Sequence, residues 1–233
     1  MHEVDRYERL EGQCVLVTGA TRGIGEQISA QLTERGATVY AGARDPSDVT
    51  ASGQRPVELD VTRDETIERA IETIRTEADR LDALVNNAGV AGPESQLHET
   101  DAADIDATLA VNLRGPIVLT RFALPLLLER SGSRVVNVSS GMGALGEGMS
   151  GAYPPYRISK AGLNALTVYL DGEYGDRGLI ANAACPGWVR TELGSPDAPK
   201  SPEEGADTPV WLTTFRPGSP SGRFWRDREF IDW

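Results

Sequence analysis

Apolar runs of strand length alternate with amphipathic segments of helix length along the chain. Short apolar runs predict buried strands, and apolar positions that recur every three to four residues predict helices. The expected strands span 14–18, 38–43, 56–61, 83–86, 134–139, 179–185 and 223–230. The expected helices span 24–35, 62–80, 102–129, 155–174 and 202–215, with a break near Gly115–Pro116. Strands that alternate with crossover helices predict an α/β fold, a doubly wound parallel sheet of about seven strands with helices on both faces.

The second expected helix carries a recognisable start signal. Thr62 is followed three residues later by Glu65, a pairing typical of a capping box. We therefore expect this helix to begin at Thr62.

Length and charge exclude several classes of protein. The 233 residues fit one domain, expected to span 1–233. With 35 acidic and 23 basic side chains the net charge is −12, so nucleic acid is not an expected partner. No run of 18 apolar residues predicts a membrane span, and the charged N-terminus lacks an apolar signal segment, so a cytoplasmic location is expected. The acidic, lysine-poor composition fits either a high-salt cytoplasm or genomic base bias.

Cysteine and histidine are too sparse for the commonest metal and hydrolytic sites. Cys14 and Cys185 lie in apolar runs, where a buried thiol is expected. His2 and His98 lie far apart in polar sequence. We therefore predict neither a metal site nor a Ser–His–Asp triad.

A glycine-rich turn follows the first expected strand and opens a helix. It reads Thr18-Gly19-Ala20-Thr21-Arg22-Gly23-Ile24-Gly25. Glycines here permit a tight turn and let the backbone approach a pyrophosphate, and the helix N-terminus favours anions. A strand before and a helix after this turn predict a Rossmann-type dinucleotide-binding domain.

A tyrosine and a lysine are spaced for proton transfer. Tyr156 and Lys160 stand four residues apart on an expected helix, so their side chains share one face. A phenol has an ordinary pKa of about 10, and a nearby ammonium is expected to lower it toward the neutral range. Tyr153 lacks this partner, because Arg157 stands four residues after it.

Six segments occur in the order found in one family. They are the TGxxxGIG turn, Asn86-Asn87-Ala88-Gly89, Asn112, Ser139-Ser140, the YxxxK of Tyr156 to Lys160, and the PGxVxT of Pro186 to Thr191. With them the chain resembles the short-chain dehydrogenase/reductase family over nearly its whole length. The short segment after Thr191 resembles the one that the carbonyl reductases of this family carry.

This resemblance implies roles for four catalytic residues. Tyr156 would donate the proton to the carbonyl oxygen, and Lys160 would lower its pKa and bind the nicotinamide ribose. Asn112 would support a water relay to Lys160, and a serine would polarise the substrate oxygen. The residues alone do not separate Ser139 from Ser140, since a shift of one residue on a strand changes the face. The family's usual position favours Ser140.

The resemblance also implies a cofactor site. Its expected residues are Gly19, Thr21, Arg22, Gly23, Ile24, Gly25, Arg44, Asp60, Val61, Asn86, Asn87, Ala88, Gly89, Tyr156, Lys160, Pro186, Gly187, Val189 and Thr191.

Two arginines bear on the choice of cofactor. An acidic residue after the second strand would bind the 2′-hydroxyl of NAD, whereas arginine accommodates a 2′-phosphate. Ala43 occupies the acidic position, followed by Arg44, and Arg22 lies in the glycine turn. We predict that NADP(H) is preferred, with NAD(H) as the alternative; Asp45 beside Arg44 would weaken this preference.

The expected substrate side is largely apolar. It includes Met142, Ala144, Leu145, Met149, Trp188 and Leu193, with a short lid at about 192–201. An apolar aldehyde, ketone or diketone fits such residues, which makes an NADPH-dependent carbonyl reductase the expected function.

Three other functions remain open on the sequence. A 3-oxoacyl-carrier-protein reductase is disfavoured because its acidic partner would be repelled. A sugar or polyol dehydrogenase and a non-catalytic NADP(H) sensor are the others. The resemblance implies the helix-mediated homodimer or homotetramer of this family. The spacing does not block it, because Tyr156 follows Ser140 by 16 residues, without the long insertion that monomeric carbonyl reductases carry.

Overall fold

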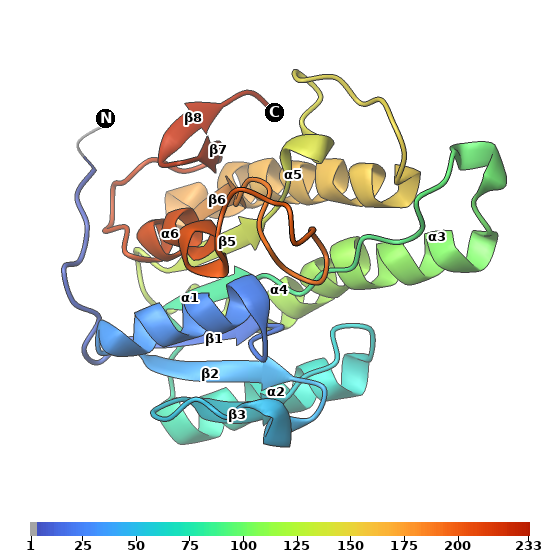
Figure 1. Ribbon diagram of the computed structural model, residues 1–233. Coiled ribbons are helices and arrows are strands. Elements are labelled where there is room, and N and C mark those ends of the chain that lie inside the picture. The colour runs from blue at the N-terminus through green and yellow to red at the C-terminus, as the bar shows by residue number, and fades with distance from the viewer. Residues whose placement is uncertain (1–3) are drawn as a thin grey trace.

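A single eight-stranded sheet in the order β3-β2-β1-β4-β5-β6-β7-β8 organises the chain (Figure 1). The computed structural model describes residues 4–233, so residues 1–3, with His2 among them, lie outside the described part. The strands are β1 Cys14–Thr18, β2 Thr38–Ala43, β3 Arg55–Glu58, β4 Ala83–Asn86, β5 Arg134–Val138, β6 Ile180–Cys185, β7 Arg223–Arg226 and β8 Glu229–Ile231. The helices are α1 Gly23–Glu34, α2 Asp64–Ala78, α3 Ala102–Leu109, α4 Gly115–Leu127, α5 Pro154–Tyr174 and α6 Pro202–Thr213.

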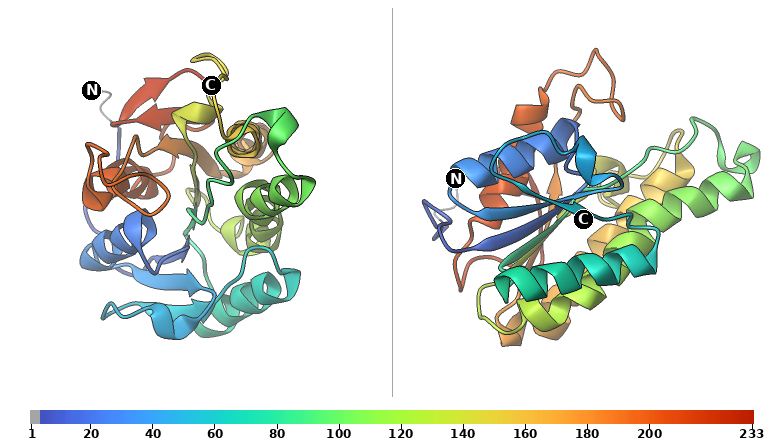
Figure 2. Two further views of the ribbon diagram at one scale, coloured as in Figure 1. Left: turned by 45° about the vertical axis from the view of Figure 1, so that its right-hand side comes forward. Right: turned by 90° about the horizontal axis from the view of Figure 1, so that it is seen from below.

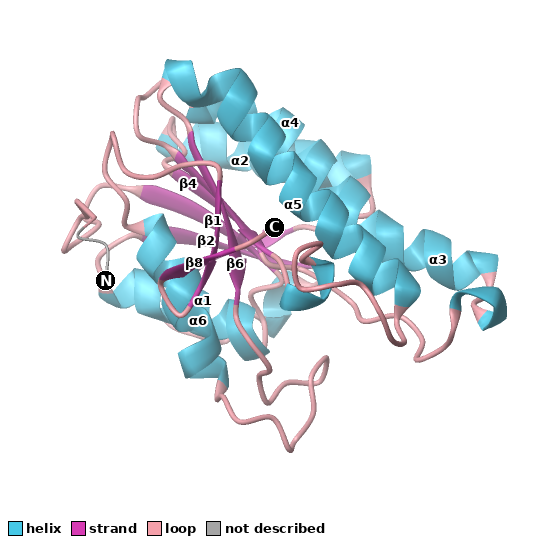
Figure 3. Cartoon of the chain, turned by 90° about the horizontal axis from the view of Figure 1, so that it is seen from above, coloured by secondary structure: helices cyan, strands magenta, loops and turns pink. Residues whose placement is uncertain are grey.

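Helices cover both faces of this sheet, as Figures 2 and 3 show. α1 and α6 lie on one face, and α2, α4 and α5 lie on the other. All neighbouring strands from β3 to β7 pair in parallel, and only β8 pairs antiparallel, with β7. The α/β fold predicted from the sequence is confirmed.

Strand residues alternate between the two cores because successive side chains point to opposite faces. Val15 and Val17 of β1 pack with α1 and α6, whereas Cys14 and Leu16 pack with α2 and α4. A strand buried on both faces needs continuous apolar sequence. The predicted bounds of β1, β2 and β4 are therefore confirmed to the residue.

The expected capping box of the second helix is wrong. α2 begins at Asp64, and Arg63 occupies its N-cap without a side-chain cap. The Thr62 hydroxyl instead donates to Asp60 Oδ1 at 2.7 Å, so it is turned away from the helix. The strand expected at 56–61 also ends early, at Glu58.

The last expected strand, 223–230, is a hairpin of β7 and β8. Asp227 and Arg228 form its turn with φ of 53° and 62°. Both angles lie in the left-handed region that two-residue hairpin turns require. The turn lacks the glycine or asparagine that is typical of such turns. The apolar pattern therefore predicted one continuous strand in place of a hairpin.

Both cysteines are buried thiols, as predicted. Within residues 4–233, no helix is long and apolar enough to cross a bilayer. The same residues hold no group of three or more metal-ligating side chains arranged to bind an ion.

Candidate active site

The glycine turn between β1 and α1 has a geometry that larger residues would disrupt. Gly19 and Gly23 have φ of 63° and 57°, which favour glycine. A Cβ on Gly25 would collide with the Gly19 carbonyl and with the Asn87 side chain. Arg22, at the N-cap of α1, leaves the first N–H groups of the helix uncapped by its side chain. These groups, with the half-buried Thr21 and Ile24 of the same turn, form a cradle that fits a pyrophosphate.

The segment after β4 is tied to this turn. The Asn87 amide side chain donates to the carbonyls of Thr18 and Gly19 at 2.9 and 3.2 Å. The backbone N–H groups of Asn87 and Ala88 both donate to the Thr18 hydroxyl at 2.9 Å. The turn and the end of β4 therefore form one rigid wall of the site.

Asn86 has a different position from the one expected of a cofactor ligand. It is 2% exposed, and its side-chain amide donates to Asn137 Oδ1 at 2.8 Å and to the Thr120 hydroxyl at 3.3 Å. Strand alternation turns it toward α4, so its side chain joins strands and does not reach the cofactor cradle.

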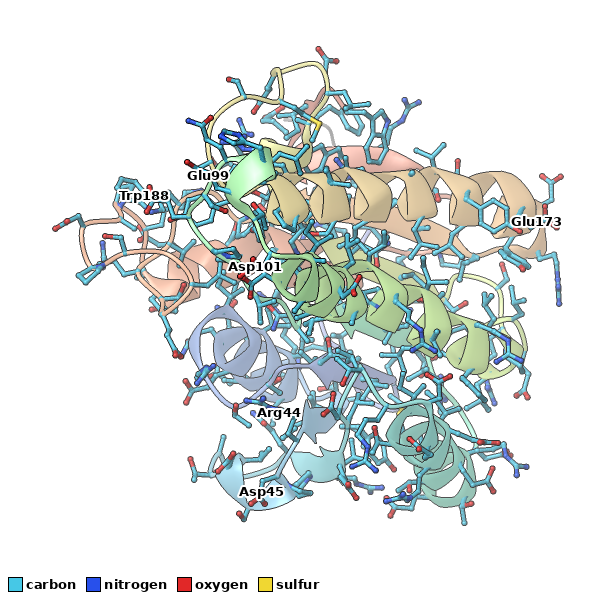
Figure 4. All side chains as sticks on the ribbon, turned by 90° about the vertical axis from the view of Figure 1, so that its right-hand side faces the viewer. Arg44, Asp45, Glu99, Asp101, Glu173 and Trp188 are labelled. Carbon is cyan, nitrogen blue, oxygen red and sulfur yellow. The ribbon has the colours of Figure 1, made fainter. Side chains whose placement is uncertain are left out.

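Arg44 and Asp45 follow β2 at the edge of the site (Figure 4). Asp45 Oδ1 accepts from the backbone N–H and the hydroxyl of Ser47 at 2.9 and 2.7 Å. The Asp45 carboxylate thus caps the short helix Pro46–Asp48. Because Asp45 is bonded to Ser47, it opposes the binding of a 2′-phosphate beside Arg44 less than the sequence suggested. Arg44 remains exposed.

Asp60 lies within the electrostatic reach of Arg44. Burial raises the pKa of Asp60, but its bonds from Thr62 and the charge of Arg44 outweigh burial and lower the pKa overall. The carboxylate is therefore an acceptor beside the arginine. Val61, next in the chain, is buried and contacts α4 at Gly115.

The segment after β6 returns to the glycine turn. Gly187 has a φ of 81°, and Val189 pairs with Lys200 in an isolated parallel bridge. Thr191 lies against Gly23, where a Cβ would meet the threonine methyl at 3.2 Å. Residues 192–201 form the loop before α6. This segment begins at Pro186, directly after β6. Through the contact of Thr191 with Gly23, it packs against the turn that follows β1.

The two serines after β5 have different environments. Ser139 is 2% exposed, and its hydroxyl donates to Asn164 Oδ1 at 2.6 Å. Ser140 is half-buried, and its hydroxyl lies near enough to the Tyr156 phenol to lower the pKa of that phenol. Ser140 is therefore the hydroxyl that shares the reacting region with Tyr156, and Ser139 anchors α5.

Burial dominates the proton affinities of Tyr156 and Lys160. It raises the pKa of Tyr156 to about 12, against a lowering by the nearby Ser140 hydroxyl. It lowers the pKa of Lys160 to about 8. Lys160 Nζ donates to the Val138 carbonyl at 2.8 Å and lies 5.6 Å from the Tyr156 ring centroid. The lowered Tyr156 pKa expected from the sequence is not found in this arrangement, because desolvation of the phenolate is the largest effect on the phenol.

Asn112 lies in a π-helical segment, Ala110–Arg114, between α3 and α4. The predicted break near Gly115–Pro116 is this change of helix type, just before Gly115. Such π-bulges are frequent at functional sites. Asn112 Oδ1 accepts from the Val90 N–H at 2.9 Å, and its Nδ2 donates to the Val90 carbonyl at 2.8 Å. Its side chain thereby fixes the backbone after Gly89, and the water relay remains a proposal.

The expected substrate side divides into exposed and buried residues. Leu145, Trp188, Leu193 and Met149 are exposed by 67%, 56%, 43% and 37%, and Met142 is half-buried. Figure 4 shows Trp188 on the same side of the molecule as Glu99 and Asp101. Ala144 is fully buried against Cys185 and Phe224, so its expected place beside the substrate is wrong.

One contact at this edge was not predicted. Tyr153, at the N-cap of α5, has a φ of 66°, and its phenol donates to Glu94 Oε2 at 2.9 Å. A left-handed aromatic residue costs free energy and often occurs at functional sites. Only the position of Tyr153 directly before Pro154 hinted at such a helix start.

A dinucleotide cradle, a Tyr–Lys pair and a serine at the carboxyl edge of a parallel sheet define a nicotinamide-dependent oxidoreductase. The family model described as short chain dehydrogenase matches residues 13–201. The chain belongs to this short-chain dehydrogenase family and is an NAD(P)-dependent enzyme of that class.

Three relatives show the range of this similarity. The short chain dehydrogenase pigC of Monascus ruber is 32% identical, covering 92% of this chain and 78% of the relative. The 3-oxoacyl-[acyl-carrier-protein] reductase FabG of Thermotoga maritima is 31% identical, covering 95% of this chain and 88% of the relative. A crystal structure of a short chain dehydrogenase from Burkholderia cenocepacia in complex with NADP is 27% identical, with a TM-score of 0.83 and coverage of 94% and 97%.

Lys160→Met is expected to stabilise the fold at low pH while removing a site residue. The pKa of Lys160 is about 8 in the folded chain and ordinarily 10.5, so the unfolded chain binds the proton more tightly and wild-type stability rises between these values. Below pH 8 the variant should gain about 1–3 kcal/mol in its free energy of unfolding, and the gain should shrink toward pH 10.5.

Urea unfolding at a pH below 8 and at one near 10.5 measures this difference. Lys200→Met is the matched control, because that ammonium is paired with Asp227 and its removal should give no gain. A Lys160→Met variant that is less stable than wild type at both pH values would contradict the expectation.

Proposed function

We propose that this enzyme is an NADPH-dependent carbonyl reductase that converts apolar aldehydes and ketones to alcohols. The observation that carries the proposal is that the Ser140 hydroxyl lies near enough to the Tyr156 phenol to lower its pKa, with Lys160 buried one helical turn further along α5. This arrangement places a hydroxyl and a phenol together where a carbonyl oxygen can accept from both.

The chain's residues divide the work of this reaction. The glycine turn, Asn87, Ala88 and Gly89 would hold the dinucleotide, with Gly187, Val189 and Thr191 opposite. Bound NADPH supplies the hydride that reduces the carbonyl carbon. Ser140 holds the carbonyl oxygen, and Tyr156 donates its proton to that oxygen as negative charge develops. Lys160 then stabilises the phenolate that remains.

The protonation state of Tyr156 favours reduction. With a pKa of about 12, the phenol keeps its proton through the neutral range, and reduction needs a proton donor. Oxidation of an alcohol needs the phenolate at the start. A sugar or polyol dehydrogenase stays an alternative, because by microscopic reversibility the same Tyr156 would accept the proton in the oxidising direction.

Two arginines support a preference for NADP(H) over NAD(H). Arg44 is exposed beside Asp60, and Asp45 is engaged by Ser47. Arg22 pairs with Glu192 at 2.8 Å, with both side chains about 70% exposed, so a phosphate could replace the carboxylate at little cost. The relative from Burkholderia cenocepacia was crystallised with NADP.

The segments at the substrate side favour a neutral apolar compound. They expose Val90, Leu97, Leu145, Trp188 and Leu193. Carboxylates stand among them, with Glu94, Glu99, Asp101 and Glu192 in the same segments. Such an edge suits an uncharged carbonyl and opposes anionic thioesters.

A 3-oxoacyl-carrier-protein reductase is the second candidate, because FabG of Thermotoga maritima is similar over most of both chains. Its carrier would have to approach a chain with a net charge of −12. The sensor function is disfavoured, since Tyr156 and Lys160 are both present and share one face of α5.

NADPH consumption against aldehydes, ketones, diketones and a 3-oxoacyl thioester tests the proposal, with NADH in parallel. Wild type should reduce the apolar carbonyls and prefer NADPH. Tyr156→Phe should lose at least about 100-fold in kcat, because it removes the proton donor. Tyr153→Phe is the matched control, three residues away, and should keep most activity.

Each alternative gives a different outcome. Turnover confined to the thioester would establish the carrier-protein reductase instead. NADPH binding with no turnover of any compound would support a sensor. Full activity of Tyr156→Phe would contradict the proposed mechanism.

The same proposal includes a homodimer or homotetramer formed through α4 and α5. Their outer faces expose Ile117, Ile158, Val168 and Tyr169, by 43% to 58%. Exposed apolar side chains gathered on neighbouring helices favour a protein–protein contact.

Val168→Glu places a charge in this face and should give a species with the mass of one chain by light scattering. The wild type should have the mass of two or four chains. A wild-type protein of single-chain mass would contradict the assembly.

A further inference from the structure

We infer that Arg226, in the C-terminal hairpin, is a positioning residue that holds the loop after β5 in place and thereby sets Ser140 against Tyr156. The inference rests on the proposed function, because it concerns the site where the carbonyl oxygen would bind. No contact between Arg226 and the substrate is required.

One guanidinium joins three elements. Arg226 Nη1 and Nη2 donate to Glu147 Oε1 and Oε2, each at 2.9 Å. Its Nε donates to Cys185 Sγ, at the end of β6, at 3.4 Å. The bidentate geometry fixes direction as well as distance, and a lysine could not reproduce it. Arg226 thus connects β7, β6 and the loop that carries Glu147.

The same group acts on the residue next to Ser140. Cys185 Sγ accepts the backbone N–H of Gly141 at 3.2 Å. A Cβ at Gly141 would collide with Arg226 and lie 3.0 Å from Glu147 Oε2. The guanidinium therefore packs directly against the backbone that follows Ser140, and it holds the loop at Gly141 and again at Glu147.

The end of the chain reinforces this attachment. The Gly146 N–H donates to the Trp233 carbonyl at 2.6 Å, and the Trp233 ring stacks on Phe224 with centroids 5.6 Å apart. Ala144 is buried in the same cluster. Figure 1 shows the C-terminus beside the yellow loop after β5. The hairpin and the residues after it therefore pack against the loop that follows β5 and hold it in place.

Two consequences for the reaction follow from this support. The loop begins directly after Ser140 and carries Met142, Leu145 and Met149 on the substrate side. A displacement of about 1 Å in a reacting group costs up to about 100-fold in rate. Releasing the loop should therefore weaken substrate binding and misplace the Ser140 hydroxyl, while the glycine turn on the other side keeps its geometry.

The test compares Arg226→Gln and Glu147→Gln, alone and combined, with Asp207→Asn as the matched control. Asp207, on α6, pairs with Arg228 in the turn of the same hairpin, so the control loses an ion pair of the hairpin without touching the loop. Steady-state kinetics give KM and kcat for the carbonyl, fluorescence gives the NADPH Kd, and hydrogen exchange reports on residues 141–152 without any ligand.

Arg226→Gln should raise KM and lower kcat/KM by about 10- to 100-fold, with the NADPH Kd unchanged. The double variant should be no worse than Arg226→Gln, since both changes break one contact. Arg226→Lys should recover part of the loss. Exchange in the loop should rise in Arg226→Gln and stay at the wild-type level in Asp207→Asn.

A folded Arg226→Gln variant with wild-type kinetics and wild-type exchange in the loop would overturn the inference. Equal losses in Arg226→Gln and Asp207→Asn would also overturn it, because they would show a general loss of hairpin stability. If wild type reduces no carbonyl, the proposed function fails, and the exchange comparison still decides whether Arg226 fixes the loop.

Discussion

The burial of Tyr156 and Lys160 at the carboxyl end of the sheet is the constraint on which the site depends. Lys160 is 4% exposed and Tyr156 is 8% exposed, although each carries a group that water would solvate well. Desolvation makes the charged form of either residue expensive. It keeps the phenol protonated, so that the phenol has a proton to donate. It also lowers the pKa of the lysine to about 8, which still leaves the lysine mostly as an ammonium at neutral pH.

Neighbouring residues compensate for this burial. Lys160 Nζ is held by the Val138 carbonyl at 2.8 Å, and Ser139 and Asn164 bond each other at 2.6 Å between β5 and α5. On the other side, Asn112 donates to the Ser159 hydroxyl at 3.1 Å. These polar contacts fix α5 against β5 and against the π-helical segment, so the two reacting side chains have little freedom. A buried polar network of this kind positions groups when all its members are bonded.

Much of this architecture could be predicted from the sequence. Strands buried on both faces leave continuous apolar runs, so β1, β2 and β4 were located to the residue. The Tyr156–Lys160 spacing and the glycine turn indicated where the chemistry lies. The hairpin at Asp227–Arg228 was missed because its left-handed turn has no glycine, and the capping box at Thr62 failed because Asp60 competes for that hydroxyl.

Other features depend on tertiary contacts that a linear pattern does not contain. The burial that raises the pKa of Tyr156 comes from elements distant in the sequence, so the expected lowering was wrong. Asn86 and Ala144 lie in motifs or segments that suggested ligand contact, and their burial became evident only from the packing. Arg226 gave no signal at all, because its partners Glu147 and Cys185 stand 79 and 41 residues away.

The most direct test of the buried pair is a titration of the Tyr156 phenol by NMR with isotope-labelled tyrosine. Subtracting the spectrum of Tyr156→Phe isolates its signal. Since burial raises the pKa of Tyr156 to about 12, the phenol should remain protonated past the ordinary tyrosine value of about 10. A phenolate that forms well below that ordinary value would contradict the account. It would show that the Lys160 ammonium, and not burial, sets the pKa of Tyr156.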